Sequence, residues 1–80
     1  MSAIPMRDYV VSGQVRAETV HDLLPFGQPM MTDTRGEPGA DPGYPFRAWL
    51  RSPTHRTMGP VAGSAQSAAD GLLEKMRGRP

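Results

Sequence analysis

The most regular pattern of hydrophobic and polar positions lies near the C-terminus of the chain. Apolar residues recur there at intervals of three and four, the spacing of one face of an α-helix; they are Ala65, Ala68, Ala69, Leu72, Leu73 and Met76. Ser64 can cap the first turn, or Pro60 can occupy it. Lys75 and Arg77 suit the last turn, where cations oppose the helix dipole. We predict an amphipathic helix within residues 61–78, with small residues at its start and large ones at its end.

The N-terminal part of the chain is less regular. Pro5 disfavours a helix, so residues 1–8 are expected to form an extended arm. A short β-type run follows at residues 9–11, and Ser12-Gly13 is a turn signal. We therefore expect this part to be extended and β-rich.

Residues 14–24 fit two different patterns. Apolar and polar residues alternate at the start of this segment, which would allow a hairpin with residues 6–11. A helical spacing fits the later part, where the apolar positions are Ala17, Val20, Leu23 and Leu24. We favour a strand to about residue 17 followed by a short helix, and the choice between strand and helix stays open.

The middle of the chain combines a long loop with a short aromatic segment. Residues 32–45 contain three Pro and three Gly, which predicts a loop. Residues 44–50 fit either a strand or one helical turn. As a strand, one face would carry Tyr44, Phe46, Ala48 and Leu50, and the other Arg47, Trp49 and Arg51. As a helical turn, one face would carry Phe46, Trp49 and Leu50.

Composition argues against a large core in this chain of 80 residues. Val, Ile, Leu and Phe number 13, about 16%, whereas globular chains usually exceed about 20%. Gly and Pro number 18, and the chain has no Cys that could form a disulfide or a thiolate metal site. We expect a small, largely irregular α+β chain that partner subunits hold in order.

Several classes of protein do not fit the sequence. No apolar stretch is long enough to span a membrane, and no apolar region follows a basic N-terminus as in a secretory signal. We expect a virion or cytoplasmic location. The chain has eight Arg but one Lys, one Ile and no Asn, which indicates a GC-rich genome, bacterial or of a phage.

Catalytic and metal-binding constellations are weak. Ser52 and His55 lie three residues apart, but no carboxylate or oxyanion hole is placed beside them, and His21 stands in a polar context. Three acidic residues of the long loop offer oxygen ligands without the spacing of a calcium loop, namely Asp33, Glu37 and Asp41. We expect no enzyme, no cofactor, no metal and no small-molecule substrate.

A basic and aromatic segment offers chemistry for nucleic acids. Between residues 44 and 58 no acidic residue occurs, and Arg47, Arg51 and Arg56 are interleaved with Tyr44, Phe46 and Trp49. Arginines on phosphates and aromatic rings on bases are the contacts that bind single strands. The other interpretation is that the aromatic residues form the core and the arginines surround it.

The last four residues, Arg77-Gly78-Arg79-Pro80, resemble the core of an AT-hook. In that motif two arginines lie along the narrow minor groove of A·T-rich DNA. The resemblance implies a DNA contact for Arg77 and Arg79. Gly78 also suits the end of the predicted helix, which needs no DNA.

The leading hypothesis is a non-enzymatic structural subunit that joins or decorates a larger assembly, such as a capsid cement or a head-associated protein of a phage virion. Its parts would be an extended, β-rich region over residues 1–60 and the helix over residues 61–78. Its expected interface residues are Tyr9, Phe26, Met30, Met31, Phe46, Trp49, Leu72, Leu73 and Met76. The alternative is a small nucleic-acid-binding or regulatory protein that uses Arg47, Arg51, Arg56, Arg77 and Arg79, and which would present its arginines together on one face.

Overall fold

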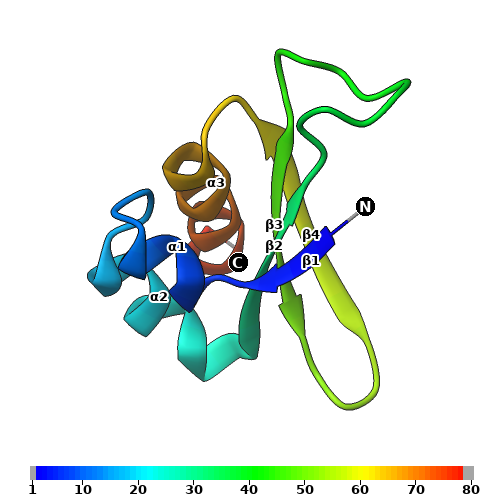
Figure 1. The fold of residues 1–80 in the computed structure, drawn as a ribbon. Coiled ribbons are helices and arrows are strands. Elements are labelled where there is room, and N and C mark those ends of the chain that lie inside the picture. Colours follow the sequence, from blue (N-terminus) through cyan, green and yellow to red (C-terminus); the bar gives the residue numbers. More distant parts are fainter. Residues whose placement is uncertain (1, 79–80) are drawn as a thin grey trace.

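Four strands form one antiparallel sheet, and helices cover one of its faces (Figure 1). The computed structural model describes residues 2–78. The strands lie in the order β1 (Ser2–Pro5), β2 (Gln28–Asp33), β3 (Phe46–Arg51) and β4 (Arg56–Ala62). The helices are α1 (Arg7–Val11), α2 (Ala17–Leu23), the 3-10 turn η1 (Leu24–Phe26) and α3 (Ala65–Arg77). This arrangement confirms the expected α+β class, and the C-terminal helix α3 packs on the sheet.

The central strand β3 confirms the alternating pattern over residues 46–51, but Tyr44, which we expected on the same face as Phe46, lies before the strand and is 56% exposed. Phe46, Ala48 and Leu50 are buried beneath the helices, whereas Arg47 and Arg51 are exposed on the opposite face. The helical alternative for this segment was wrong, because successive side chains point to opposite faces of a strand.

Helix α3 packs on the sheet as its apolar stripe predicts. The Ser64 hydroxyl caps it by accepting a hydrogen bond from the N–H of Ser67 at 3.2 Å. Its first turn holds small residues, and Gly71 lies so close to β4 that a Cβ there would come within 2.9 Å of the Pro60 ring. Gly59 in β4 is equally crowded, since a Cβ would lie 2.8 Å from the Ala48 carbonyl oxygen. Pro60 thus belongs to β4, not to the first turn of the helix.

The expected hairpin near the N-terminus was wrong. Residues 7–11 and 17–23 are the short helices α1 and α2, joined by a turn in which Gly13 has a φ of 79°. The N–H groups of Gln14 and Val15 both donate to the Tyr9 carbonyl oxygen and reverse the chain. This reversal buries Tyr9 and Val15 against the core. Within α2, Leu23 is buried, but Ala17 faces solvent.

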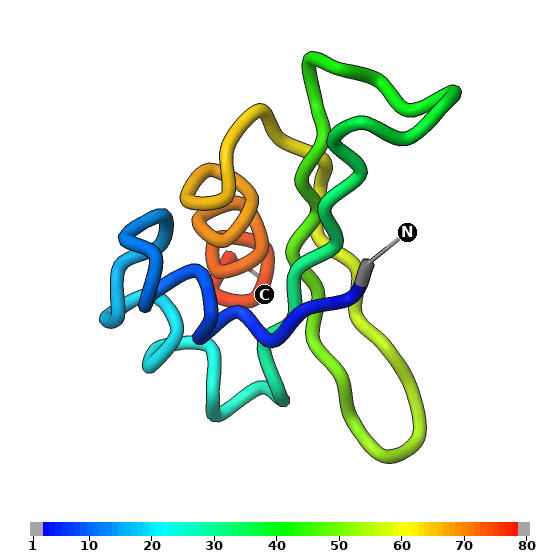
Figure 2. Tube along the Cα trace, in the orientation of Figure 1, coloured from blue at the N-terminus to red at the C-terminus, as the bar shows by residue number. Residues whose placement is uncertain are grey.

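Three further segments are more ordered than the sequence suggests. The expected N-terminal arm contains β1, whose Ile4 is paired with Met31 of β2. Strands β2 and β4 contain Pro29 and Pro60, and these prolines concealed them in the sequence. Of the loop expected over residues 32–45, Thr32 and Asp33 belong to β2 and residues 34–45 do form a long loop. This loop projects beyond one end of the sheet, while the turn after β3 projects beyond the other (Figure 2).

The core is built from this chain's own residues. Among the described residues, the largest fully buried side chains are Met6, Leu23, Met31, Leu50 and Leu72. Four alanines, Ala48, Ala65, Ala68 and Ala69, are at most 3% exposed and allow the helix and sheet to approach closely. The radius of gyration is 11.8 Å, close to the roughly 11.6 Å of a compact domain of this length. The chain is therefore compact and not largely irregular, and it supplies by itself the burial that we expected from partner subunits.

Candidate nucleic-acid interface

The face of the sheet that the helices leave open carries three arginines. Arg51 and Arg56 are direct partners across β3 and β4, so both side chains point to the same face. Arg47 lies four residues before Arg51 in β3 and shares that face, at a spacing of about 13 Å along the strand. All three are exposed. We call these residues, Arg47, Arg51 and Arg56, the arginine face.

The arginine face lacks internal charge compensation. In the described part of the chain, no ion pair involves any of its three guanidinium groups. Like charges directly opposite each other, as at Arg51 and Arg56, destabilise a sheet. An anion bound across them would relieve this repulsion, and three cations spread over one face suit an extended anion better than a single phosphate.

Trp49 packs beneath Arg56 of the arginine face. Its side chain is 5% exposed, and its Nε1–H donates to the Thr32 hydroxyl at 3.0 Å. The guanidinium carbon of Arg56 lies 5.2 Å from the centre of the indole ring, a cation–π contact. Trp49 thus holds Arg56 in place and leaves no free ring face on which a base could stack.

An apolar hollow of about 400 Å³ lies beside Arg47, between the long loop and β4. Its apolar walls include Tyr44, Met58 and Val61, which are 56%, 39% and 47% exposed. The Asp41 carboxylate also lines it and accepts a hydrogen bond from the N–H of Gly43 at 2.8 Å. We call this the Tyr44 hollow. Sequence reasoning found Tyr44 but missed Met58 and Val61, because the pairing of β4 with β3 was not apparent.

Five acidic side chains lie on the helix side of the sheet, whereas Asp41 lines the Tyr44 hollow beside Arg47. Strands β3 and β4 contain no acidic residue, and Asp33 of β2 is held on the helix side by Tyr9. Four acidic residues line a groove between α2 and α3, namely Glu18, Asp22, Asp70 and Glu74. Two arginines of the same groove pair with them, Arg16 with Asp70 at 3.5 Å and Arg77 with Asp22 at 2.8 Å. The net charge of +1 therefore conceals a molecule with one basic and one more acidic side.

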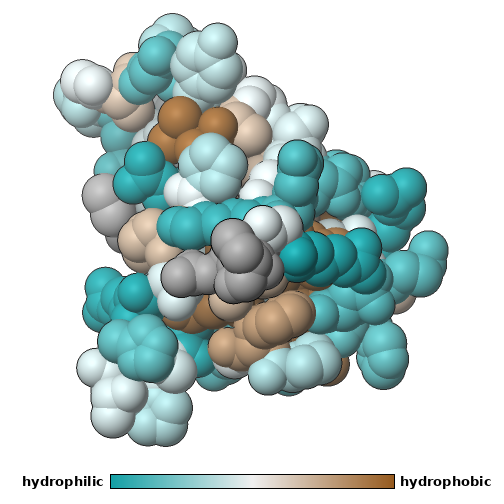
Figure 3. All heavy atoms as spheres, turned by 180° about the vertical axis from the view of Figure 1, so that it is seen from behind, coloured by the Kyte–Doolittle hydropathy of each residue, from teal (hydrophilic) through white to brown (hydrophobic). Residues whose placement is uncertain are grey.

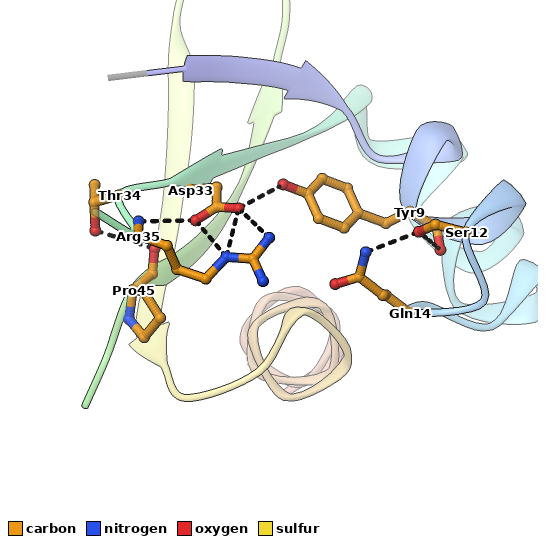
Figure 4. Close-up of polar contacts among 7 residues, drawn as sticks. All are labelled: Tyr9, Ser12, Gln14, Asp33, Thr34, Arg35 and Pro45. Carbon is orange, nitrogen blue, oxygen red and sulfur yellow. Dashed lines mark hydrogen bonds and ion pairs between the residues drawn. The ribbon is translucent and has the colours of Figure 1, made fainter. Parts of the chain in front are cut away.

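A network of polar contacts fixes the start of the long loop (Figure 4). Asp33 accepts hydrogen bonds from Arg35, the shortest at 2.7 Å, and from the Tyr9 hydroxyl at 3.4 Å. The hydrogen bonds from Arg35 hold the pKa of Asp33 below its ordinary value of 3.8. Burial, with the nearby charge of Asp33, raises the pKa of Tyr9 above 10.0. Arg35 also lies over the Phe46 ring, 4.9 Å from its centre, so the network joins α1, β2, β3 and the loop.

Most of the residues expected at a protein interface lie in the chain's own interior. Seven are at most 8% exposed, namely Tyr9, Met30, Met31, Phe46, Trp49, Leu72 and Leu73. Met76 is partly buried against the core, and Phe26 is 44% exposed. Of this set, Phe26 is the side chain that the fold leaves most accessible to a partner.

Arg77 does not join the arginine face. Arg77 lies in the last turn of α3 and pairs with Asp22 of α2 across the helix groove. Gly78 ends the helix, and its N–H donates to the Glu74 carbonyl oxygen at 2.7 Å. Arg79 and Pro80 lie outside the described residues.

Ser52 and His55 form the turn between β3 and β4. The Ser52 hydroxyl donates to the His55 carbonyl oxygen at 2.8 Å, and the Thr54 hydroxyl lies 3.0 Å from Nδ1 of His55. All three residues are intermediate or exposed in their burial. These contacts close a turn at the end of the sheet.

Comparison with protein-family models, with curated proteins and with solved structures finds no match to this chain. Over residues 2–78, no group of three or more His, Asp or Glu side chains is placed to hold a metal ion. None of the helices in that range has the length and apolar character needed to cross a membrane.

Proposed function

We propose that this chain is a small, non-enzymatic nucleic-acid-binding protein that holds a single strand on the open face of its sheet. The observation that carries the proposal is the arginine face: Arg47, Arg51 and Arg56 project together from β3 and β4. Three of the five arginines of the nucleic-acid hypothesis thus share one face, whereas Arg77 pairs with Asp22 in the groove between α2 and α3. Such a face would bind phosphates by electrostatic attraction and by release of counterions.

The hypothesis of a structural subunit in a larger assembly rested mainly on the expectation that the chain lacks a core of its own. It assigned the missing burial to partner subunits, whereas Leu72 is fully buried and Trp49 nearly so within this chain. Figure 3 shows a face of the molecule that is mostly hydrophilic, with small and separate hydrophobic areas. A large apolar contact with another subunit gains no support from that face.

The salt dependence of binding tests the proposal. We expect a labelled single-stranded 12-mer to bind with a log–log slope of about −2 against salt, since three contacts contribute about −0.7 each on single strands. Arg51→Gln should weaken binding and reduce the slope by about 0.7. Fluorescence anisotropy at several salt concentrations measures both quantities.

Arg7→Gln provides the matched control. Arg7 is an exposed arginine of α1, on the side of the sheet that the helices cover, and its loss changes the net charge equally. It should leave the affinity and the slope nearly unchanged. Equal effects of the two substitutions, or no salt-dependent binding by the unaltered chain, would contradict the proposal.

A subunit of a larger assembly, such as a phage virion, is the second candidate function. The turn η1 favours it, because Leu24 and Phe26 are 55% and 44% exposed and lie two residues apart. Association through this apolar turn would be insensitive to salt, unlike binding at the arginine face. Association with another protein subunit that persists unchanged in high salt would therefore favour the assembly role.

A further inference from the structure

The Tyr44 hollow lies at one end of the arginine face. Arg47 belongs to both, because it lines the hollow and is paired with Val61, which forms another wall. Arg51 and Arg56 continue the face toward the opposite end of the sheet. A strand whose phosphates follow the three arginines would therefore pass the mouth of the hollow.

The size and lining of the hollow suit a flat, mostly apolar ring. Its volume of about 400 Å³ falls within the roughly 300–1,000 Å³ typical of ligand sites. Tyr44 offers an accessible aromatic ring, and Met58 and Val61 offer apolar contact. Met side chains adapt their shape to an inserted group.

The charges around the hollow indicate which part of a nucleotide would enter it. Asp41 lines the hollow, and its negative charge would repel a phosphate. Arg47 at the same hollow attracts the phosphate toward the open face of the sheet. The base would then lie inside and the backbone outside.

We infer that the Tyr44 hollow receives one unpaired base of a single strand whose phosphates lie on the arginine face. This inference rests on the proposed function and extends it by naming the site that holds a base of the strand. A duplex keeps its bases stacked and paired, and unstacking one of them costs free energy. The chain should therefore select single strands over duplexes.

The test compares one labelled 12-mer of mixed sequence, single-stranded and annealed to its complement, by fluorescence anisotropy. We expect the unaltered chain to bind the single strand about tenfold more tightly, within the range that stacking of one base provides. Tyr44→Ala should remove most of that preference, and Tyr44→Phe should keep it because the ring remains. The slope against salt should stay the same in both variants, since the arginines are untouched.

Two further variants secure the interpretation. Met58→Ala alters another wall of the hollow and should reduce single-strand affinity selectively, independently of any effect of Tyr44→Ala on folding. Val11→Ala removes an apolar side chain that is 87% exposed on α1, and should change neither affinity. Circular dichroism confirms that each variant is folded.

The outcomes separate this inference from the proposed function. Equal affinity of the unaltered chain for both forms, or unchanged selectivity in folded Tyr44→Ala and Met58→Ala, would overturn the inference while Arg51→Gln still weakened binding. Absence of salt-dependent binding to either form would overturn the proposed function, and the inference with it.

Discussion

Gly59 and Gly71 determine how closely α3 approaches the sheet. A Cβ on Gly59 would lie 2.8 Å from the Ala48 carbonyl oxygen and 3.1 Å from Cβ of Leu72. A Cβ on Gly71 would lie 2.9 Å from the Pro60 ring. Gly71 lowers the helix propensity of α3 by about 1 kcal/mol relative to Ala, and the close packing explains why glycine suits this position. The sequence indicated that Gly71 lowers helix propensity, but it did not indicate the close contact with Pro60.

Leu72 should be among the most sensitive positions for stability. It is fully buried between α3 and the sheet, and truncation to Ala would leave a cavity. We expect Leu72→Ala to lower the free energy of unfolding by about 2–5 kcal/mol. Urea unfolding followed by circular dichroism measures this change.

Val11→Ala is the control for that measurement. Val11 is 87% exposed, so its truncation should change the free energy of unfolding by no more than about 0.5 kcal/mol. If the two substitutions had similar effects, the packing of α3 described here would be incorrect.

Strand β3 shows which elements the sequence could predict. Its alternation of apolar and polar residues placed Arg47 and Arg51 on one face correctly. Strand β4 could not be found in the same way, because Gly59 and Pro60 interrupt its pattern. Its pairing with β3 adds Arg56 to the face, and such pairing depends on contacts between residues far apart in the sequence. The helix α3 was predicted well because its spacing and its cap are local features.

The contacts of Asp33 should make stability depend on acid. The folded pKa of Asp33 is below the ordinary value of 3.8, so its ionised form favours the folded state. Its contribution is fully present above about pH 3.8 and is lost as the pH falls through the folded pKa. Asp33→Asn should therefore be less stable than the unaltered chain at neutral pH, with a difference that shrinks below pH 3.8. Urea unfolding at a series of pH values measures it.

Arg35 identifies the source of that difference. Arg35→Gln removes the hydrogen bonds that lower the pKa of Asp33, so the effects of the two substitutions should not add. A difference that stayed constant down to pH 2, or fully additive effects, would contradict the assigned role of this network.

At the scale of the whole molecule, composition gave a misleading impression of the core. The small number of Val, Ile, Leu and Phe residues suggested that the chain could not fold on its own. The structure fills its interior with alanines and methionines, including Ala48, Ala68, Met6 and Met31, all fully buried. Alanines contribute little apolar area each, but they allow backbones to pack closely. A count of large apolar residues does not register this kind of core.

Net charge was misleading in the same way. A value of +1 gives no sign of a site for a polyanion, yet the fold places three arginines on one face and four acidic residues in the groove between α2 and α3. Local charge, not the total, governs attraction at short range, because salt screens charges beyond about 8–10 Å. The three arginines of the candidate site could thus be predicted from the sequence, but the distribution of acidic side chains around them could not.

The measurement that tests this account most directly is a ¹H–¹⁵N spectrum of the isolated chain, titrated with a single-stranded 12-mer. The free chain should give well-dispersed signals, because its core is its own. On titration, the indole N–H of Trp49, the sole tryptophan, and the Nε–H signals of Arg47, Arg51 and Arg56 should shift together. Signals of α2 and of Arg16, in the groove between α2 and α3, should stay in place. A collapsed spectrum of the free chain, or shifts confined to that groove, would contradict the account.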